Sequence, residues 1–132
     1  MPPRFEVTFR VRQYGERWSI AVGVITEYRK DKQSSGDQDE REAAGLVSNS
    51  RDERGSVWVD GVCQFEDEDR MFVPPQRQVR MEVDLLELTI RFTSLAFECS
   101  RVTPLPEVFR KKKVYLFIAM NCKGDCVEIL PK

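Results

Sequence analysis

The chain has 132 residues, of which 41% are apolar, and a formal net charge of −1, which fits one globular domain with a single core. This charge gives no bulk attraction to phosphate, and no apolar run approaches the ~20 residues of a membrane-spanning helix, so neither nucleic acid nor a membrane is an expected partner. The chain contains no histidine. This absence excludes Ser-His-Asp and Cys-His nucleophiles, histidine bases and histidine-ligated metals, so we expect no enzyme activity, no metal and no cofactor.

The first residues lead directly into a strand-like segment without a signal-peptide pattern, which favours a cytoplasmic or nuclear protein. Four cysteines are few for a secreted module held together by disulfides. We expect Cys63, Cys99 and Cys126 to be small buried hydrophobes within strands. Two alternatives stay open: a zinc site that combines these three with Cys122, and a disulfide between Cys122 and Cys126.

Apolar and polar side chains alternate at the start of the chain, the pattern of a strand with one buried face. Residues 5–11 and 17–25 form two such strands, and a turn at Gly15 is expected to join them as a hairpin. In the second strand Ala21 and Gly23 share a face of small residues. Such a face indicates that something, such as another backbone, packs closely against it.

Residues 30–55 are charged and poor in apolar side chains, so we expect a long mobile loop within the domain, with one helical turn near residues 40–47. Deleting residues 30–49 is then expected to leave the fold intact. The acidic block 66–69 is expected to be a solvated loop, because it lacks the alternating ligands and glycine of a calcium loop.

Strand patterns resume at residues 56–59, and Asp60-Gly61 predicts a tight hairpin to residues 62–65. Two further alternating segments, 79–85 and 86–92, are out of phase, which predicts a turn or bulge at Leu85-Leu86. The last elements are a short strand at 95–97, a loop over 100–113, a doubly covered central strand at 114–120, and a final strand at 126–130.

These short strands predict an all-β fold, a bent antiparallel sandwich of two sheets that spans residues 1–132. Several apolar residues keep a consistent phase in the strands and are expected to form the core, and Leu88→Ala is expected to cost about 2–5 kcal/mol. The predicted core residues are Phe5, Val7, Trp18, Val22, Val83, Leu88, Phe92, Leu116 and Ile118.

The order of the segments resembles the SPRY (B30.2-like) domain family. The stretches that carry the resemblance are 5–7 with 18–24, 55–58, 79–84, 88–92, 114–118 and 124–129. The chain departs from the family pattern at Met81-Glu82, where the family has Gly-Val, and at Leu116, where it has proline. Neuralized-type repeats and galectin-like lectins share this layout.

The resemblance implies a bent sandwich without catalytic activity. It also implies that loops at one edge bind a peptide or a partner protein, in the manner of the substrate-recognition part of a ubiquitin ligase or of a scaffold protein. A galectin-like carbohydrate-binding domain is the alternative function. Galectin-type sugar sites use histidine, asparagine and arginine around a tryptophan, and this chain has no histidine.

Exposed aromatic side chains are the best candidates for a binding surface, because tyrosine and tryptophan are enriched in interface hot spots. Phe72 lies among charges and prolines, where a large apolar side chain has no obvious core to join. Arginines beside such residues supply directional donors, and the neighbouring acidic block favours a partner with basic character. The predicted partner-binding residues are Tyr28, Arg29, Trp58, Arg70, Met71 and Phe72.

Overall fold

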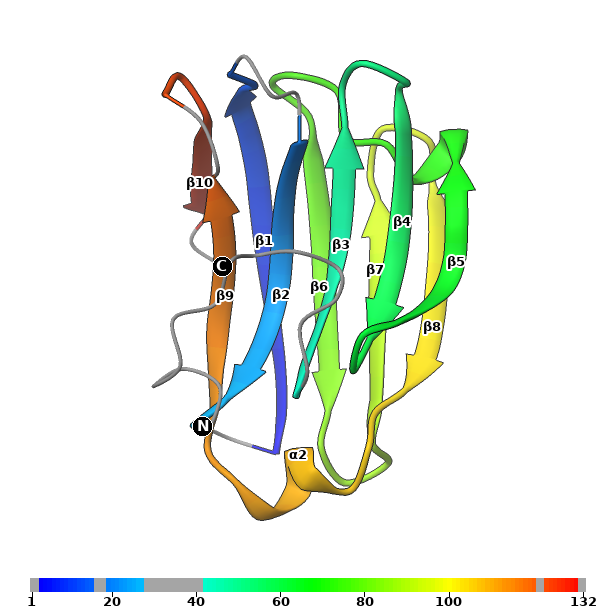
Figure 1. Cartoon of the computed structure of the whole chain (residues 1–132), viewed down its shortest axis with the longest axis vertical. Coiled ribbons are helices and arrows are strands. Elements are labelled where there is room, and N and C mark those ends of the chain that lie inside the picture. Colours follow the sequence, from blue (N-terminus) through cyan, green and yellow to red (C-terminus); the bar gives the residue numbers. More distant parts are fainter. Residues whose placement is uncertain (1–2, 16–18, 28–41, 121–122, 131–132) are drawn as a thin grey trace.

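The computed structural model describes residues 3–15, 19–27, 42–120 and 123–130. Within these ranges, strands dominate and form two antiparallel sheets that pack face to face (Figure 1). The predicted β-sandwich is therefore confirmed. No helix in the described ranges is long and apolar enough to cross a membrane.

The two sheets contain five strands each. Sheet A, which lies behind in Figure 1, has the order β10-β1-β6-β7-β8. Its strands are β1 (Arg4–Gln13), β6 (Gln78–Asp84), β7 (Thr89–Ser94), β8 (Cys99–Pro104) and β10 (Cys126–Leu130). Sheet B has the order β5-β4-β3-β2-β9. Its strands are β2 (Ser19–Thr26), β3 (Ala43–Asn49), β4 (Arg54–Val59), β5 (Val62–Glu68) and β9 (Val114–Met120).

The main core fills the space between the sheets, because alternate side chains of every strand point inward. Three of the predicted core residues, Val22, Val83 and Phe92, are fully buried there. The remaining described ones are only partly buried and pack against this core at its margins; these are Phe5, Val7, Leu88, Leu116 and Ile118. Trp18 lies outside the described residues.

Two predicted turns are confirmed. Asp60 and Gly61 both have positive φ, 51° and 79°, as a two-residue hairpin turn requires, and they join β4 to β5. The phase slip at Leu85-Leu86 is a turn over residues 85–88 between β6 and β7. Leu88 belongs to this turn with a φ of 55°, and since its side chain is only half-buried, the expected large cost of Leu88→Ala is not supported.

The predicted hairpin of the first two strands is wrong. β1 pairs with β6 and β10 in sheet A, whereas β2 pairs with β3 and β9 in sheet B. Each strand turns its apolar face to the common core from the opposite side, a placement that alternation alone does not distinguish from pairing. Gly15, after β1, lies close to the 123–125 turn, where a Cβ on Gly15 would be 2.6 Å from the Lys123 carbonyl oxygen.

The predicted loop over residues 30–55 is also wrong in part, because its second half contains β3 and the start of β4. No helical turn forms at residues 43–47. β3 is hydrogen-bonded between β2 and β4, and its residues Ala43, Ala44 and Leu46 are buried. Deletion through residue 49 would therefore remove an inner strand of sheet B. The charged residues 30–41 lie outside the described residues.

The last third of the chain differs from the prediction at three points. Residues 95–98 form a turn instead of a strand, and the expected loop over 100–113 contains most of β8 and the short helix α2 (Val108–Lys111). β9 is an edge strand, not a central one. It is apolar on both faces because one face packs on the main core while Tyr115 and Phe117 on the other face join a second cluster.

This second cluster covers the outer face of sheet B. Register places Trp58, Gly45, Gly23 and Phe117 in one row across β4, β3, β2 and β9. The rings of Trp58 and Phe117 meet edge to face, with centroids 6.4 Å apart, on the face where the two glycines have no side chains. The small face predicted for the second strand is thus confirmed as a place of close packing.

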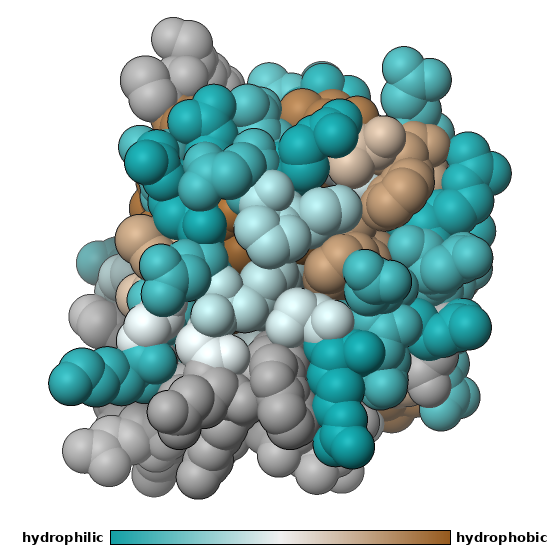
Figure 2. Space-filling view, turned by 90° about the horizontal axis from the view of Figure 1, so that it is seen from above, coloured by the Kyte–Doolittle hydropathy of each residue, from teal (hydrophilic) through white to brown (hydrophobic). Residues whose placement is uncertain are grey.

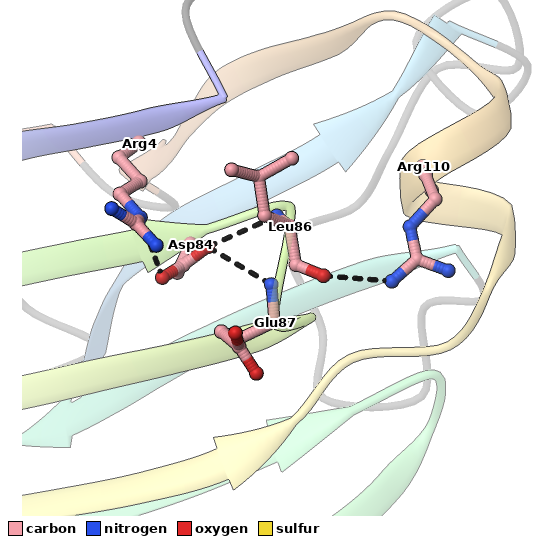
Figure 3. A network of polar contacts seen from close by, with 5 residues as sticks. All are labelled: Arg4, Asp84, Leu86, Glu87 and Arg110. Atoms are coloured by element: carbon pink, nitrogen blue, oxygen red, sulfur yellow. Dashed lines mark hydrogen bonds and ion pairs between the residues drawn. The ribbon is translucent and has the colours of Figure 1, made fainter.

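Asp84 lies at the end of β6, beside the turn that joins β6 to β7, and forms a network of polar contacts there (Figure 3). Its Oδ1 accepts hydrogen bonds from the backbone N–H groups of Leu86 and Glu87, both 3.0 Å, while its Oδ2 pairs with Arg4 Nε at 2.9 Å. The side chain of Arg110 closes the network with a 2.8 Å hydrogen bond to the Leu86 carbonyl. The hydrogen bond from the Glu87 N–H is the largest cause that holds the pKa of Asp84 below its usual value. Desolvation is the next largest effect and opposes it, while Arg4 and the Leu86 N–H lower the pKa further.

This lowered pKa predicts a pH-dependent contribution to stability. Because the folded-state pKa lies below the unfolded one, the contribution is fully present above the unfolded pKa, about 3.9, and is lost as pH falls through the folded pKa. We expect Asp84→Asn to be less stable than the wild type at neutral pH, and the gap in urea midpoint to shrink as the solution is acidified. Asp84→Ala, which also loses both N–H bonds, should stay destabilised at every pH. A gap for Asp84→Asn that does not change with pH would contradict this role of the charge.

Candidate functional site

Three loops meet at the upper end of the sandwich in Figure 1. They are the β3–β4 turn at residues 50–53, the short 3-10 helix η1 (Asp69–Met71) with the segment that follows it, and the β7–β8 turn at residues 95–98. Figure 2 looks down on this end and shows hydrophobic atoms gathered beside hydrophilic ones. Loops carried at one end of a rigid sandwich are a common place for binding sites.

A groove of about 630 Å³ lies between these loops, within the usual volume range of ligand sites. Most of its apolar surface comes from aromatic and proline side chains, and its polar atoms come from acidic residues, a serine and one arginine. The residues that line it are Ser50, Glu53, Asp69, Arg70, Phe72, Pro74, Pro75 and Phe97. We call this the upper groove.

Hydrogen bonds among Tyr14, Ser48 and Val73 hold the segment that contains Phe72. We call these bonds the ring beneath the groove. The Phe72 ring stacks on Tyr14 with centroids 5.9 Å apart, and the Tyr14 hydroxyl donates a hydrogen bond to the Val73 carbonyl at 2.5 Å. Ser48 Oγ accepts from the Val73 N–H at 3.0 Å and lies 2.6 Å from the Tyr14 hydroxyl, to which it can donate. Burial raises the pKa of Tyr14 well above its usual value, so the Tyr14 hydroxyl stays protonated and can donate its hydrogen bond at physiological pH.

One wall of the groove is fixed by Arg70, which is exposed at the surface. Its Nη2 donates a 3.1 Å hydrogen bond to the carbonyl of Phe97 and so ties η1 to the β7–β8 turn. The Phe97 side chain is 39% exposed. A large aromatic side chain that remains exposed on a fixed turn offers apolar area at small conformational cost to a partner.

η1, which carries the groove residues Asp69 and Arg70, approaches β4 closely. Met71 is fully buried and anchors η1, and Gly55 of β4 lies directly under it. A Cβ on Gly55 would be only 2.2 Å from the Met71 carbonyl oxygen. The absence of a side chain at Gly55 therefore allows η1 to pack onto the sheet.

The acidic block is not the solvated loop that its composition predicted. Residues 66–68 belong to β5, and Asp69 begins η1. Glu68 forms a two-point ion pair with Arg101, at 2.6 and 2.9 Å, and the Arg101 guanidinium lies 5.6 Å from the Phe65 ring centroid. This contact links the edge strands β5 and β8, and Asp69, the residue after Glu68, lines the groove.

The predicted site residues are only partly brought together. Arg70 and Phe72 line the upper groove, but the expectation that Met71 and Phe72 are exposed is wrong, since they are 0% and 5% exposed. Trp58 is fully buried in the second cluster on the outer face of sheet B, so it offers no surface to a partner here. Tyr28 and Arg29 lie outside the described residues.

Sequence reasoning missed the groove residues Ser50, Glu53 and Phe97. The first two lie in the segment interpreted as a mobile loop, and Phe97 was assigned to a strand. The only local signal was Pro74-Pro75, which ends strand pairing beside Phe72. The three loops are separated along the chain, and pairing of β3 with β4 and of β7 with β8 is what carries them to one end.

The cysteines divide by environment. Cys99 is buried as predicted, whereas Cys63 and Cys126 lie at the surface, contrary to the prediction. Cys122 is outside the described residues. In the described part of the chain, no three cysteine, aspartate or glutamate side chains cluster in a way that could hold a metal ion.

The described residues thus form a β-sandwich with a groove between loops at one end. No protein-family model and no curated protein matches the sequence. Among solved structures, the crystal structure of the TRIM65 PSpry domain is similar, with a TM-score of 0.72 at 14% sequence identity. The match covers 100% of this chain and 65% of that chain. The fold is therefore SPRY-like, and the similarity supports the SPRY rather than the Neuralized interpretation.

Proposed function

We propose that this chain is a non-catalytic protein-interaction module that binds a peptide or a partner protein surface in the upper groove. The observation that carries the proposal is the exposed Phe97 beside Phe72 and two prolines, on loops that hydrogen bonds hold in place. Preformed apolar grooves with a few polar groups at the rim are typical of binding sites, because binding then orders few side chains.

The SPRY-like fold supports this function in general terms. A finer proposal is that the domain is the substrate-recognition part of a ubiquitin ligase or of a scaffold protein, acting in the cytoplasm or the nucleus. The chain spans 65% of the TRIM65 PSpry chain. A ligase or scaffold role would belong to a larger protein that contains this domain, and we state that role only as a proposal. The alternative function, carbohydrate binding, is tested by measuring whether the purified domain binds to a glycan array.

The proposal is tested with peptides selected on the immobilised domain from a phage-displayed random dodecapeptide library. We expect selected peptides to bind the wild type and to lose at least about tenfold in affinity on Phe97→Ser, because an exposed aromatic anchor is removed. Titration calorimetry measures the affinity, and thermal unfolding should show nearly unchanged stability.

Leu86→Ser is the matched control. Leu86 is 57% exposed, more than Phe97, and lies in the turn at the opposite end of the sandwich. The Leu86→Ser variant should bind the selected peptides as tightly as the wild type does. Peptides that are insensitive to Phe97→Ser but sensitive to Leu86→Ser would place the binding surface at the other end and refute the upper groove.

A further inference from the structure

Two carboxylates line the upper groove without a hydrogen bond or ion pair in the described part of the chain. Glu53 comes from the β3–β4 turn and Asp69 from the start of η1, so separate loops bring them to one groove. No hydrogen bond or ion pair to either carboxylate is formed among the residues that the structure describes. Glu68, the neighbour of Asp69, differs because Arg101 neutralises it.

The loops that carry these carboxylates are held by their own backbone contacts. Asn49 Oδ1 accepts from the N–H groups of Arg51 and Asp52, at 2.9 and 3.4 Å, which shapes the turn that ends at Glu53. The Asp69 carbonyl accepts from the Phe72 N–H at 3.3 Å. A cation that enters the groove would therefore meet two negative charges whose backbone positions are already set.

The positive charge of Arg70 does not balance the charges of Glu53 and Asp69. Among the described residues that line the groove, Arg70 is the only arginine or lysine, and one of its N–H donors is used on the Phe97 carbonyl. The lining set thus carries two negative charges against one positive charge. Its other surface is aromatic or proline, which suits the aliphatic stem of a long cationic side chain and the face of a guanidinium.

We propose that the upper groove recognises a partner segment in which an arginine adjoins an apolar residue, with the apolar side chain against Phe97 and the arginine paired with Glu53 and Asp69. This inference rests on the proposed function and names its ligand chemistry. Arginine fits better than lysine because its planar guanidinium both stacks on a ring and pairs with a carboxylate through two donors.

The test uses the same dodecapeptide selection. Selected sequences should be enriched in arginine next to an apolar residue, and replacing that arginine with lysine should weaken binding. The double variant Glu53→Gln with Asp69→Asn keeps the shape of both side chains and removes both charges. It should lower affinity for these peptides about tenfold or more and flatten the dependence of affinity on salt, because exposed charges are screened by ions. Glu66→Gln is the matched control, since Glu66 is exposed in the same acidic block but does not line the groove.

The outcomes separate this inference from the proposed function. Loss of affinity in the double variant, with Glu66→Gln unchanged, supports both. Peptides that require Phe97 but lack arginine, or that bind the double variant as tightly as the wild type, overturn the arginine assignment and leave the proposed function standing. If no selected peptide depends on Phe97, the proposed function fails, and the inference fails with it.

Discussion

Gly23→Ala is expected to destabilise the domain by about 3 kcal/mol or more, although alanine is ordinarily the better residue in a strand by roughly 0.5–1 kcal/mol. A Cβ on Gly23 would lie 1.9 Å from the Ala44 carbonyl oxygen and 2.6 Å from the Gly45 Cα. Both obstacles are backbone atoms of the neighbouring strand β3, so the clash cannot be relieved by rotating a side chain. β2 would have to separate from β3, and urea denaturation followed by circular dichroism measures the loss.

Two further variants identify the cause of this loss. Val62→Ile also adds one carbon to a strand of sheet B, but Val62 is 57% exposed, so the midpoint should barely move. Phe117→Leu in the Gly23→Ala background should not restore stability, because the obstacle is the β3 backbone and not the ring above it. Rescue by Phe117→Leu would show that aromatic packing, rather than strand approach, requires the glycine. A Gly23→Ala domain as stable as the wild type would refute the close approach itself.

The row of Trp58, Gly45, Gly23 and Phe117 also shows how far the sequence predicts this fold. The small face of the second strand pointed to close packing, and period-two alternation predicted most strands of both sheets. The row itself could not be predicted, because it depends on register across four strands. β3 was missed for a related reason: Ala43, Ala44 and Gly45 have weak strand propensity and follow a charged run. What makes them a strand is pairing with β2 and β4 on either side.

The candidate site was less predictable than the fold. Phe72 was taken as exposed because its neighbours in sequence are charged or proline. It is buried, and Tyr14, which directly follows β1, stacks on it. Glu53 and Phe97 gave no local sign of function, since each belongs to an ordinary turn. A site made of several loops forms only when the strands that carry those loops pair with one another. Local sequence patterns can therefore indicate single residues of the site, but they do not predict how those residues are arranged.

Gly55→Ala is expected to damage stability and the upper groove together. The added Cβ would lie 2.2 Å from the Met71 carbonyl oxygen and 2.5 Å from its carbonyl carbon, so η1 must lift from β4. Met71 is fully buried, and lifting it exposes apolar surface, for which we expect a loss of about 2–3 kcal/mol. Asp69, Arg70 and Phe72 move with η1, so peptides that depend on Phe97 should bind at least about tenfold more weakly even where the domain remains folded.

Amide hydrogen exchange locates the damage. The Val73 N–H donates to Ser48 Oγ in the ring beneath the groove and should exchange faster in Gly55→Ala, whereas amides of β6 and β7 keep their order of protection. Glu66→Ala, an exposed change in the neighbouring strand β5, should alter neither stability nor Val73 exchange. Truncating Met71 to alanine in the Gly55→Ala variant should add to the loss, because the obstacle is the carbonyl and not the Met71 side chain. A Gly55→Ala domain that stays stable but no longer binds peptide would limit the role of Gly55 to the groove. One that keeps stability, Val73 protection and binding would show that η1 does not rest on β4 as described.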